Sequence, residues 1–289
     1  MTAFQLFCNK AHRGPGGTLL LLSAIICLNS CGFGGNSDGS SVIGGILTEL
    51  IKGAASSQPE SLELPAITAA DNVIEHTGFV LSYNPSTKLP HWVAYELTSE
   101  ETEGDADRDE FIFKKDPEWK SSQAMREDYA ESGWTKGHMA CAGDFKWDED
   151  AMEETFYLTN ICPQDRELNK GDWNYLEKQV RHWARRYGKA WVVSGPIVGK
   201  NKYGKIGERD VTVPDAFFKA VLTPTKGGYQ SIAFVMGNDS KRYYLDKCSM
   251  SVNELERLTG LDLFTALPDD IEEQTEGQYS PKDWGIKVK

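Results

Sequence analysis

The chain has 289 residues, of which 40% are hydrophobic and 26% are charged, and 43 acidic against 31 basic residues give a net charge of −12. This balance is typical of a globular protein with a full hydrophobic core and excludes a chain that is disordered throughout. An acidic protein repels polyanions at long range, so a nucleic-acid ligand would need a local basic patch or a bound cation to hold it.

The first thirty residues have the order of a secretory signal. A segment with Lys10 and Arg13 is followed by the apolar run TLLLLSAIICL, which is too short for a comfortable membrane span, and then by small residues. The exit LNSC resembles a bacterial lipobox, so residues 1–30 are expected to be a lipoprotein signal peptide and Cys31 the lipidated residue. Plain secretion and a retained signal anchor are the alternatives.

Removal of this signal takes away two basic residues and leaves 29 against 43 acidic ones, a net charge of −14. The expected location is the bacterial cell envelope, with the protein anchored to the membrane through Cys31 and facing the periplasm or the surface. Residues 31–70 begin Gly/Ser-rich and lack a sustained period, which predicts a flexible tether. The folded domain is expected over residues 71–289.

The domain begins with two β-rich runs, residues 79–83 and 91–97, around a turn, which predicts a hairpin. The acidic stretch SEETEGDADRDEFIFKKDPEWKSS follows and predicts a solvated surface insertion that contains one notable cation, Arg108. Next come a short helix capped by Asp148 and the buried strand FYLTNICPQ.

The strongest helix is predicted over residues 169–187 and ends at Gly188. Its apolar stripe and its polar stripe both follow helical spacing; the first contains Trp173, Leu176, Val180, Trp183 and Tyr187, and the second contains Lys170, Glu177, Arg181 and Arg185. Three strand-like runs and a helix with a Ser251–Glu254 capping box complete the chain. These elements predict one α+β domain with a mainly antiparallel sheet.

The segment GWTKGHMACAGDF contains His138, which fits a general base, a metal ligand or a surface residue. A zinc site with Cys141 and Cys162 lacks a C-x-x-C pair and a fourth ligand, so it is set aside. These two cysteines and Cys248 remain after the signal, which allows one disulfide and one leftover thiol, or packing alone.

Asn169 has two interpretations. It can be the N-cap of the long helix, or it can supply a neutral oxygen near the core that, with Glu177 two turns further on, holds a hydrated Mg²⁺. Residues 164–189 carry seven basic side chains against four acidic ones, so this segment is the local basic patch that an acidic nucleic-acid-binding protein needs.

Three segments, KGHMACAGDF, FYLTNICPQ and LNKGDWNYLEKQVR, together resemble the DNA/RNA non-specific endonuclease family, whose members have a ββα-metal (His-Me finger) fold and include endonuclease G. RDEFIFKKDP is similar to the Arg-x-x-x-Phe-x-x-Asp-Pro segment of that family. The resemblance runs from about residue 78 to 267. The order and spacing of the segments make the resemblance specific, although each match alone is weak.

The resemblance implies a Mg²⁺-dependent nuclease that cuts DNA and RNA to 5′-phosphate products, with Mn²⁺ as an alternative metal. His138 matches the general base and Asn169 the direct metal ligand. The remaining matches, with their implied roles, are Glu177 for ordering metal-bound water, Asn160 near the metal and substrate, Arg108 for binding phosphate, and Arg181 as a further phosphate contact.

The family motif Asp-Arg-Gly-His is here Thr135-Lys136-Gly-His. Lys136 keeps the positive charge of the arginine as an expected catalytic residue but loses its bidentate fork, and Thr135 does not replace the aspartate. The alternatives are therefore a nucleic-acid-binding lipoprotein with weakened catalysis and a phosphodiesterase of the same fold that acts on another phosphoester. A protein inhibitor is a further expected partner.

Overall fold

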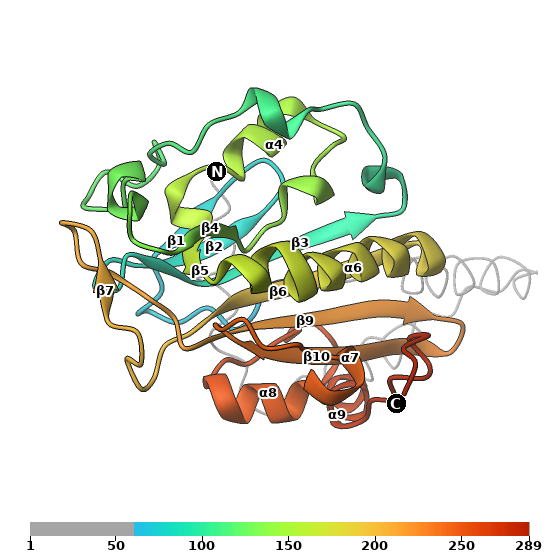
Figure 1. Ribbon diagram of the computed structural model, residues 1–289. Helices are drawn as coiled ribbons and strands as arrows, with labels where there is room; N and C mark the ends of the chain where they lie inside the picture. The colour runs from blue at the N-terminus through green and yellow to red at the C-terminus, as the bar shows by residue number, and fades with distance from the viewer. Residues whose placement is uncertain (1–60, 289) are drawn as a thin grey trace, which may run out of the picture. The chain divides into compact units, whose positions relative to one another are not determined.

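A seven-stranded antiparallel sheet runs through residues 61–288, the part of the chain that the structure describes (Figure 1). The structure is a computed structural model. The strand order is β1-β2-β3-β6-β9-β10-β11, in which β2–β3 and β9–β10 are hairpins. The strands are β1 (Val73–Glu75), β2 (Val80–Asn84), β3 (Leu89–Thr98), β6 (Lys189–Ile197), β9 (Ala216–Thr225), β10 (Gly228–Gly237) and β11 (Ser249–Met250).

Both faces of this sheet are apolar. Successive side chains of a strand point to opposite sides, so alternate residues of a strand enter different buried clusters. On β3, Val93 and Tyr95 belong to one buried cluster, whereas Trp92 and Ala94 belong to the other. A sheet with two apolar faces needs a covering layer on each side, and the helices provide these layers.

The long helix α6 packs on one face, where Trp183 stacks on Phe234 of β10 with ring centroids 6.0 Å apart. The helices α8 and α9 lie on the other side of the sheet, and Val252 and Leu255 of α8 join the second cluster (Figure 1). The helices are α4 (Glu149–Glu154), α5 (Arg166–Leu168), α6 (Asn174–Tyr187), α7 (Leu245–Cys248), α8 (Val252–Thr259) and α9 (Asp269–Gly277).

Two short antiparallel ladders, β4 with β5 and β7 with β8, lie outside the main sheet. Their strands are β4 (Thr135–His138), β5 (Ile161–Gln164), β7 (Lys205–Ile206) and β8 (Val211–Thr212). The short helical turns are η1 (Glu100–Thr102), η2 (Arg108–Glu110), η3 (Arg126–Tyr129), η4 (Ala142–Asp144), η5 (Leu158–Asn160) and the π-helical η6 (Asn169–Trp173).

Several predictions from the sequence are confirmed. The α+β fold with a mainly antiparallel sheet is present, and the first hairpin lies where it was expected. Asp148 accepts a hydrogen bond from a backbone N–H of α4, and Ser251 forms the capping box of α8 with Glu254. Gly188 ends α6 with a φ of +89°, a conformation that glycine adopts without steric cost.

Two predictions about local structure were wrong. The helical run starts before Asn169, at α5. Asp165 is the N-cap of α5, because its side chain accepts hydrogen bonds from the N–H groups of Glu167 and Leu168. Asn169 is therefore not an N-cap. The acidic stretch is not wholly a solvated insertion either, since Asp116 is 1% exposed and bonded within the domain.

The predicted signal peptide, Cys31 and most of the predicted tether lie outside the described residues. The described end of the tether, residues 61–70, contacts the domain: Leu62 is fully buried, and the N–H of Ala66 donates to the carbonyl of Asp262 at 2.7 Å. Within residues 61–288, none of the helices combines the length and the apolar character that crossing a membrane requires. Cys141, Cys162 and Cys248 are buried free thiols.

Candidate active site

The β4–β5 ladder brings His138 beside the segment that leads into the long helix. His138 is the last residue of β4 and lies opposite Ile161, the first residue of β5. Because side chains alternate along a strand, Lys136 and His138 share one face of β4 and Thr135 lies on the other.

His138 packs its ring against two phenylalanines. Its ring centroid lies 5.3 Å from that of Phe113 and 5.0 Å from that of Phe156. Nε2 is inaccessible and lacks a hydrogen-bond partner among residues 61–288, whereas the residue as a whole is partly exposed, so Nδ1 is on the open side. Burial, and after it the charge of Arg108, lowers the pKa of His138 from 6.5 to about 3. The imidazole is therefore neutral at neutral pH and able to accept a proton.

Asn169 reaches from η6 to β4. Its Nδ2 donates to Oγ1 of Thr135 at 3.0 Å and to the backbone oxygen of Lys136 at 3.3 Å. Thr135 uses its own hydroxyl proton to donate to the oxygen of Gln164 at 2.8 Å, so Oγ1 faces Asn169 as an acceptor. This arrangement fixes the amide with Nδ2 toward β4, and within residues 61–288 Oδ1 has no hydrogen-bond partner.

Thr135 therefore has a role that the sequence pattern did not predict. The motif of the family has an aspartate at this position, and we had expected threonine not to replace it. The hydroxyl of Thr135 nevertheless accepts a hydrogen bond from Asn169 and orients its amide. Thr135 thus holds the amide of Asn169 although it departs from the motif.

Asn160 does not reach the surface. It is fully buried, and its Oδ1 accepts from the N–H of Ala140 at 2.8 Å. Its Nδ2 donates to the oxygens of Ala140 and Thr155 at 3.0 and 2.8 Å. Because these bonds occupy the whole amide, the expected contact of Asn160 with substrate is wrong. Asn160 instead fixes the turn that follows His138.

Lys136 and Arg108 supply positive charge on the side of His138. Nζ of Lys136 lies 5.5 Å from the ring centroid of Phe113 and 5.1 Å from that of Tyr129. Burial lowers the pKa of Lys136, and the charge of Arg126 lowers it further. Arg108 belongs to η2, is exposed, and is close enough to His138 to lower its pKa. Lys136 thus shares the imidazole face of β4, and Arg108 is near enough to act on the charge of His138.

Arg181 and Glu177 belong to a buried charged network behind β4. Arg181 pairs with Asp144, whose other oxygen accepts from the hydroxyl of Tyr95 at 2.7 Å. The Arg181 and Asp144 side chains are 15% and 0% exposed. Nη1 of Arg181 is engaged internally, and the expected contact of Arg181 with phosphate stays a prediction.

Glu177 is 9% exposed, and burial raises its pKa, although the nearby ammonium of Lys219 opposes this shift. Lys219 is fully buried, and its Nζ donates to the backbone oxygen of Met139 at 3.4 Å. Met139 is the residue that follows His138. Glu177 and Lys219 therefore bring opposite charges to the inner side of the site, where water has little access.

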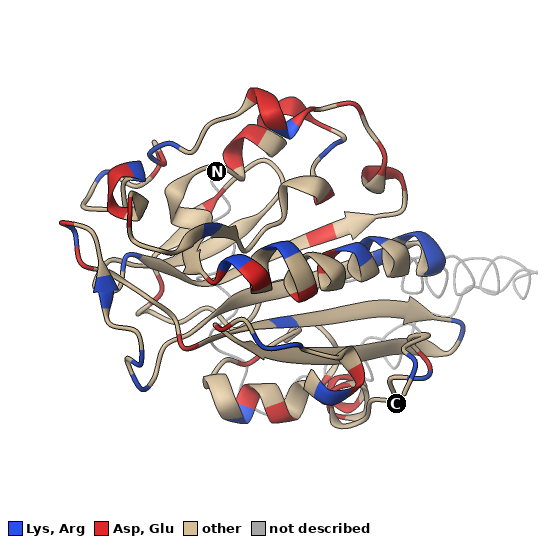
Figure 2. Cartoon of the chain, in the orientation of Figure 1, with Lys and Arg blue, Asp and Glu red and all other residues tan. Residues whose placement is uncertain are grey.

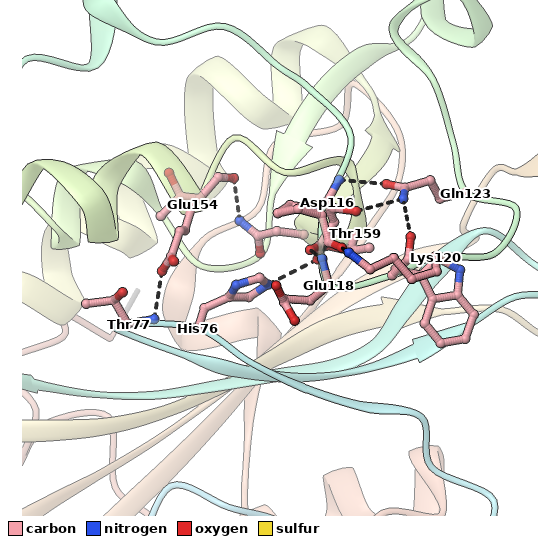
Figure 3. Close-up of polar contacts among 12 residues, drawn as sticks. His76, Thr77, Asp116, Glu118, Lys120, Gln123, Glu154 and Thr159 are labelled. Atoms are coloured by element: carbon pink, nitrogen blue, oxygen red, sulfur yellow. Dashed lines mark hydrogen bonds and ion pairs between the residues drawn. The ribbon is translucent and has the colours of Figure 1, made fainter.

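A second buried network, drawn in Figure 3, supports the turn on which Asn160 lies. The carboxylate of Asp116 accepts from the hydroxyl of Thr159 and bonds Nε2 of His76 at 3.1 Å. Gln123 closes the loop around it by bonding both the N–H and the oxygen of Asp116 at 2.8 and 3.0 Å. Burial alone would raise the pKa of Asp116, but the bonds from His76 and Thr159 lower it. Asp116 therefore joins three separate segments as a charged anchor.

The basic residues of the structure are concentrated along α6 and in the segment around β7, whereas the loops near α4 are mainly acidic (Figure 2). Residues 61–288 contain no group of three or more His, Cys, Asp and Glu side chains that would hold a metal ion. A cation bound in this part of the chain would therefore be held by fewer than three His, Cys, Asp and Glu side chains.

Comparison with known proteins identifies the family. Residues 62–270 match the DNA/RNA non-specific endonuclease family, so the chain belongs to this family. The mitochondrial nuclease EXOG of Xenopus laevis is 40% identical over 218 residues, covering 70% of this chain and 60% of that protein. Human mitochondrial endonuclease G is 36% identical over 196 residues, covering 63% and 66% of the two chains.

A solved structure of the complex of EndoG with EndoGI, whose title describes a mechanism of EndoG inhibition, is also similar. Its TM-score is 0.67 at 28% identity, over 74% of this chain and 94% of that chain. The resemblance to the ββα-metal nuclease fold is thereby confirmed. The chain spans about 60% of the length of the EXOG relatives from Xenopus and Danio rerio.

The predicted location in a bacterial cell envelope is contradicted by these relatives. They are named as mitochondrial nucleases, in animals and in yeast, and they point to mitochondria rather than to a lipid-anchored envelope protein. The physical reason for the error is that an N-terminal segment with basic residues and no acidic ones occurs in secretory and in organelle-targeting sequences alike. The first acidic residue here is Asp38.

Proposed function

We propose that the chain is a divalent-metal-dependent endonuclease that hydrolyses phosphodiester bonds of DNA and RNA with little sequence preference and leaves 5′-phosphate ends. One observation carries this proposal: β4 presents a neutral imidazole at His138 and, through Thr135, fixes the amide of Asn169 with its oxygen free. Membership of the endonuclease family and the naming of its relatives as nucleases support it.

The residues around Asn169 fit a hydrated Mg²⁺, with Mn²⁺ as the alternative ion. Mg²⁺ keeps several of its waters and accepts one or two protein oxygens, which suits a site with one free amide oxygen and no cluster of three acidic or imidazole ligands among the described residues. When bound, such a cation neutralises charge on the phosphate and on the leaving oxygen. Asn169 is the proposed ligand, through Oδ1.

His138 is the proposed general base. With its proton on the inaccessible Nε2, the lone pair of Nδ1 faces the open side and takes the proton of the attacking water. The aromatic rings of Phe113 and Phe156 hold the imidazole and keep it uncharged before the reaction. A neutral base is available over the whole physiological pH range.

Arg108 and Lys136 are the proposed phosphate-binding cations. Arg108 exposes a guanidinium that can bind two phosphate oxygens at once, and such charge-assisted pairs are stronger than neutral hydrogen bonds. Lys136 contributes a compact point of positive charge beside the imidazole face of β4. Both cations stabilise the additional negative charge of the transition state.

Glu177 is proposed as a positioning residue rather than as a group that touches substrate. Its carboxylate lies in the network that includes Asp144 and Lys219, and it faces the inner side of the site. We propose that it orders water on the side of Asn169. Its raised pKa makes this contribution dependent on the positive charge of Lys219.

Recognition of the phosphate backbone, not of base edges, accounts for action on both DNA and RNA. The net charge of −12 requires local cations, which α6 and the segment around β7 supply (Figure 2). By analogy with the EndoG/EndoGI complex, we propose that a protein inhibitor covers the same site.

Substitution of Asn169 tests this proposal. Asn169→Ala in the full chain should raise the Mg²⁺ concentration for half-maximal cleavage of plasmid and RNA by about ten- to a hundredfold. Asn174→Ala is the matched control, since this residue is only five positions further and its Nδ2 bonds the oxygen of Lys170 at 3.3 Å. Asn174→Ala should retain the wild-type Mg²⁺ dependence.

Three outcomes decide between the candidate functions. An unchanged Mg²⁺ dependence in Asn169→Ala would overturn the ligand assignment. A wild-type chain that binds nucleic acid but cuts none with Mg²⁺ or Mn²⁺ would identify a binding protein with lost catalysis. Cleavage of small phosphodiesters alone would identify a phosphodiesterase that acts on another ester.

A further inference from the structure

One buried lysine lies where elements of the candidate site meet. Lys219 belongs to β9, and its side chain is fully buried. Its Nζ donates to the backbone oxygen of Met139 at 3.4 Å and lies 5.0 Å from the ring centroid of Trp173. Met139 follows His138 at the end of β4, and Trp173 ends η6, which begins with Asn169. The ammonium therefore contacts the segments that carry the proposed base and the proposed metal ligand.

The main sheet holds this ammonium in place. Lys219 lies opposite Ser194 of β6, and residues opposite each other in an antiparallel pair point to the same face. The hydroxyl of Ser194 donates to the same oxygen of Met139, at 2.8 Å. Phe217 and Val221, which share the face of Lys219 on β9, belong to the cluster that α6 covers. The charge of Lys219 is therefore fixed between the sheet and α6.

The charged groups around Lys219 balance only when Lys219 is included. Arg181 of α6 pairs with Asp144 of η4, which leaves Glu177 of α6 and Lys219 as the remaining acid and base. After burial, the charge of Lys219 is the largest influence on the pKa of Glu177, and it lowers this pKa. Burial lowers the pKa of Lys219, and the charges of Glu177 and Asp144 oppose this shift. The titratable groups that face one another here are Tyr95, Cys141, Asp144, Glu177, Arg181 and Lys219.

The stability of the sheet does not account for a charge at this position. Moving an ammonium or a carboxylate out of water costs free energy that their attraction returns only in part, so apolar residues of similar volume are often as stable. The neighbours of Lys219 on its own face of β9, Phe217 and Val221, are apolar. A buried carboxylate that has to stay ionised does account for the charge, because a nearby cation favours the ionised form.

We propose that Lys219 is a positioning residue of the nuclease site, whose ammonium is the fixed counter-charge of the Glu177 carboxylate that orders water. This proposal rests on the proposed nuclease function and adds to it a residue that does not touch substrate. A protonated Glu177 would offer water an O–H donor in place of an acceptor, so loss of the counter-charge changes the water that Glu177 orders. The contacts with Met139 and Trp173 seat the ammonium.

The first test follows the two charges directly, in the full chain without metal. The side-chain carbon signals of Glu177 and Lys219 are followed by NMR over pH in EDTA, and they are assigned by their loss in Glu177→Gln and Lys219→Met. Lys219→Met should raise the pKa of Glu177, because the carboxylate loses its cation. Glu177→Gln should lower the pKa of Lys219 for the reciprocal reason, and this measurement does not depend on the folding of Lys219→Met.

Ser194→Ala is the matched control for these titrations. It removes the shorter of the two bonds to the oxygen of Met139 but no charge. Both pKa values should therefore stay as in the wild type. If Glu177→Gln leaves the pKa of Lys219 unchanged, or if a folded Lys219→Met leaves the pKa of Glu177 unchanged, the proposal is overturned.

The second test measures the consequence for cleavage. At saturating Mg²⁺ and neutral pH, Lys219→Met should slow single-turnover cleavage of plasmid by about ten- to a hundredfold, as expected for a group that supports metal-bound water. The acid limb of its pH profile should move to higher pH, while plasmid binding in EDTA stays unchanged because Lys219 is buried. In a Glu177→Gln background, Lys219→Met should cost less than about threefold, because the charge that it supports is already gone.

The outcomes separate this proposal from the proposed function. A Lys219→Met enzyme that melts like wild type and keeps the wild-type rate and acid limb would overturn the positioning role and leave nuclease activity intact. The same shift of the acid limb in Ser194→Ala would overturn it as well, because the bond to Met139 and not the charge would then be responsible. A chain that cuts neither DNA nor RNA with any divalent metal would refute the nuclease function, and the titrations in EDTA would still decide whether Lys219 is the counter-charge of Glu177.

Discussion

Thr135→Val removes the hydroxyl that orients Asn169 and replaces it with a methyl group of similar size. Two hydrogen bonds disappear, from Thr135 to Gln164 at 2.8 Å and from Asn169 to Thr135 at 3.0 Å. The amide of Asn169 then keeps only its longer bond to Lys136, at 3.3 Å. If each lost bond contributed about 1 kcal/mol net, the oriented amide becomes less favourable by about 1–2 kcal/mol, or roughly five- to thirtyfold.

This loss should appear as a weaker response to metal. The Mg²⁺ concentration for half-maximal plasmid cleavage should rise by that factor, while the rate at saturating Mg²⁺ changes less. Thr135→Ser keeps the hydroxyl and should stay within about threefold of wild type. A Thr135→Val enzyme with wild-type Mg²⁺ dependence and unaltered melting would refute the reasoning, because Asn169 would then be oriented by something other than Thr135.

Two further predictions concern pH and the buried network. Because burial lowers the pKa of His138 to about 3, its base form is present above about pH 4 and is lost only as the pH falls through 3. The acid limb of kcat/KM at saturating metal should therefore lie below about pH 5, and a limb near 6.5 would contradict this environment. Arg181→Met should lower the free energy of unfolding in urea by about 3–5 kcal/mol, because it leaves Asp144 buried without its cation. A variant with wild-type stability and a large loss of nucleic-acid affinity would instead return Arg181 to the substrate surface.

Much of the fold could be predicted from local patterns. The hairpin of β2 and β3, the apolar stripe of α6 and the caps at Asp148 and Ser251 depend on neighbouring residues alone. The start of the long helix could not be predicted in the same way, because Asp165 and Asn169 are both good caps by residue type. Only the bonds that Asp165 makes to two N–H groups show which one acts as the cap.

The candidate site was predictable in its residue types but not in its partners. His138 ends β4 and Asn169 bonds the same strand, while Lys136 shares the face of His138 and Arg108 acts on its charge; their catalytic roles stay predictions. The helical spacing of Arg181 is that of a surface residue, but its side chain turns inward and pairs with Asp144, which lies 37 positions away in the sequence. Such long-range pairing leaves no periodic signal in the sequence.

Thr135 and Asp116 were missed for a related reason. Because Thr135 departs from the motif of the family, comparison by residue type predicts that the role of the aspartate is lost. The hydrogen bond from Asn169 needs only an oxygen acceptor, however, and threonine and aspartate both offer one. Asp116 lies in an acidic stretch that predicts solvent exposure, but His76 and Thr159, 40 and 43 positions away, enclose it. The Asp-Pro pair at positions 116 and 117 was the only sign in the sequence that this acid differs from its neighbours.

The central claim is that His138 is the base of a metal-dependent nuclease. Its most direct test compares the full-length wild type with His138→Ala on supercoiled plasmid and on a long RNA, at saturating Mg²⁺ and under single-turnover conditions. The wild type should cut both substrates to fragments with 5′-phosphates, and His138→Ala should be slower by a factor on the order of 10²–10⁴ with unchanged substrate binding. Equal cleavage rates for the two proteins, or no cleavage by either, would contradict the account.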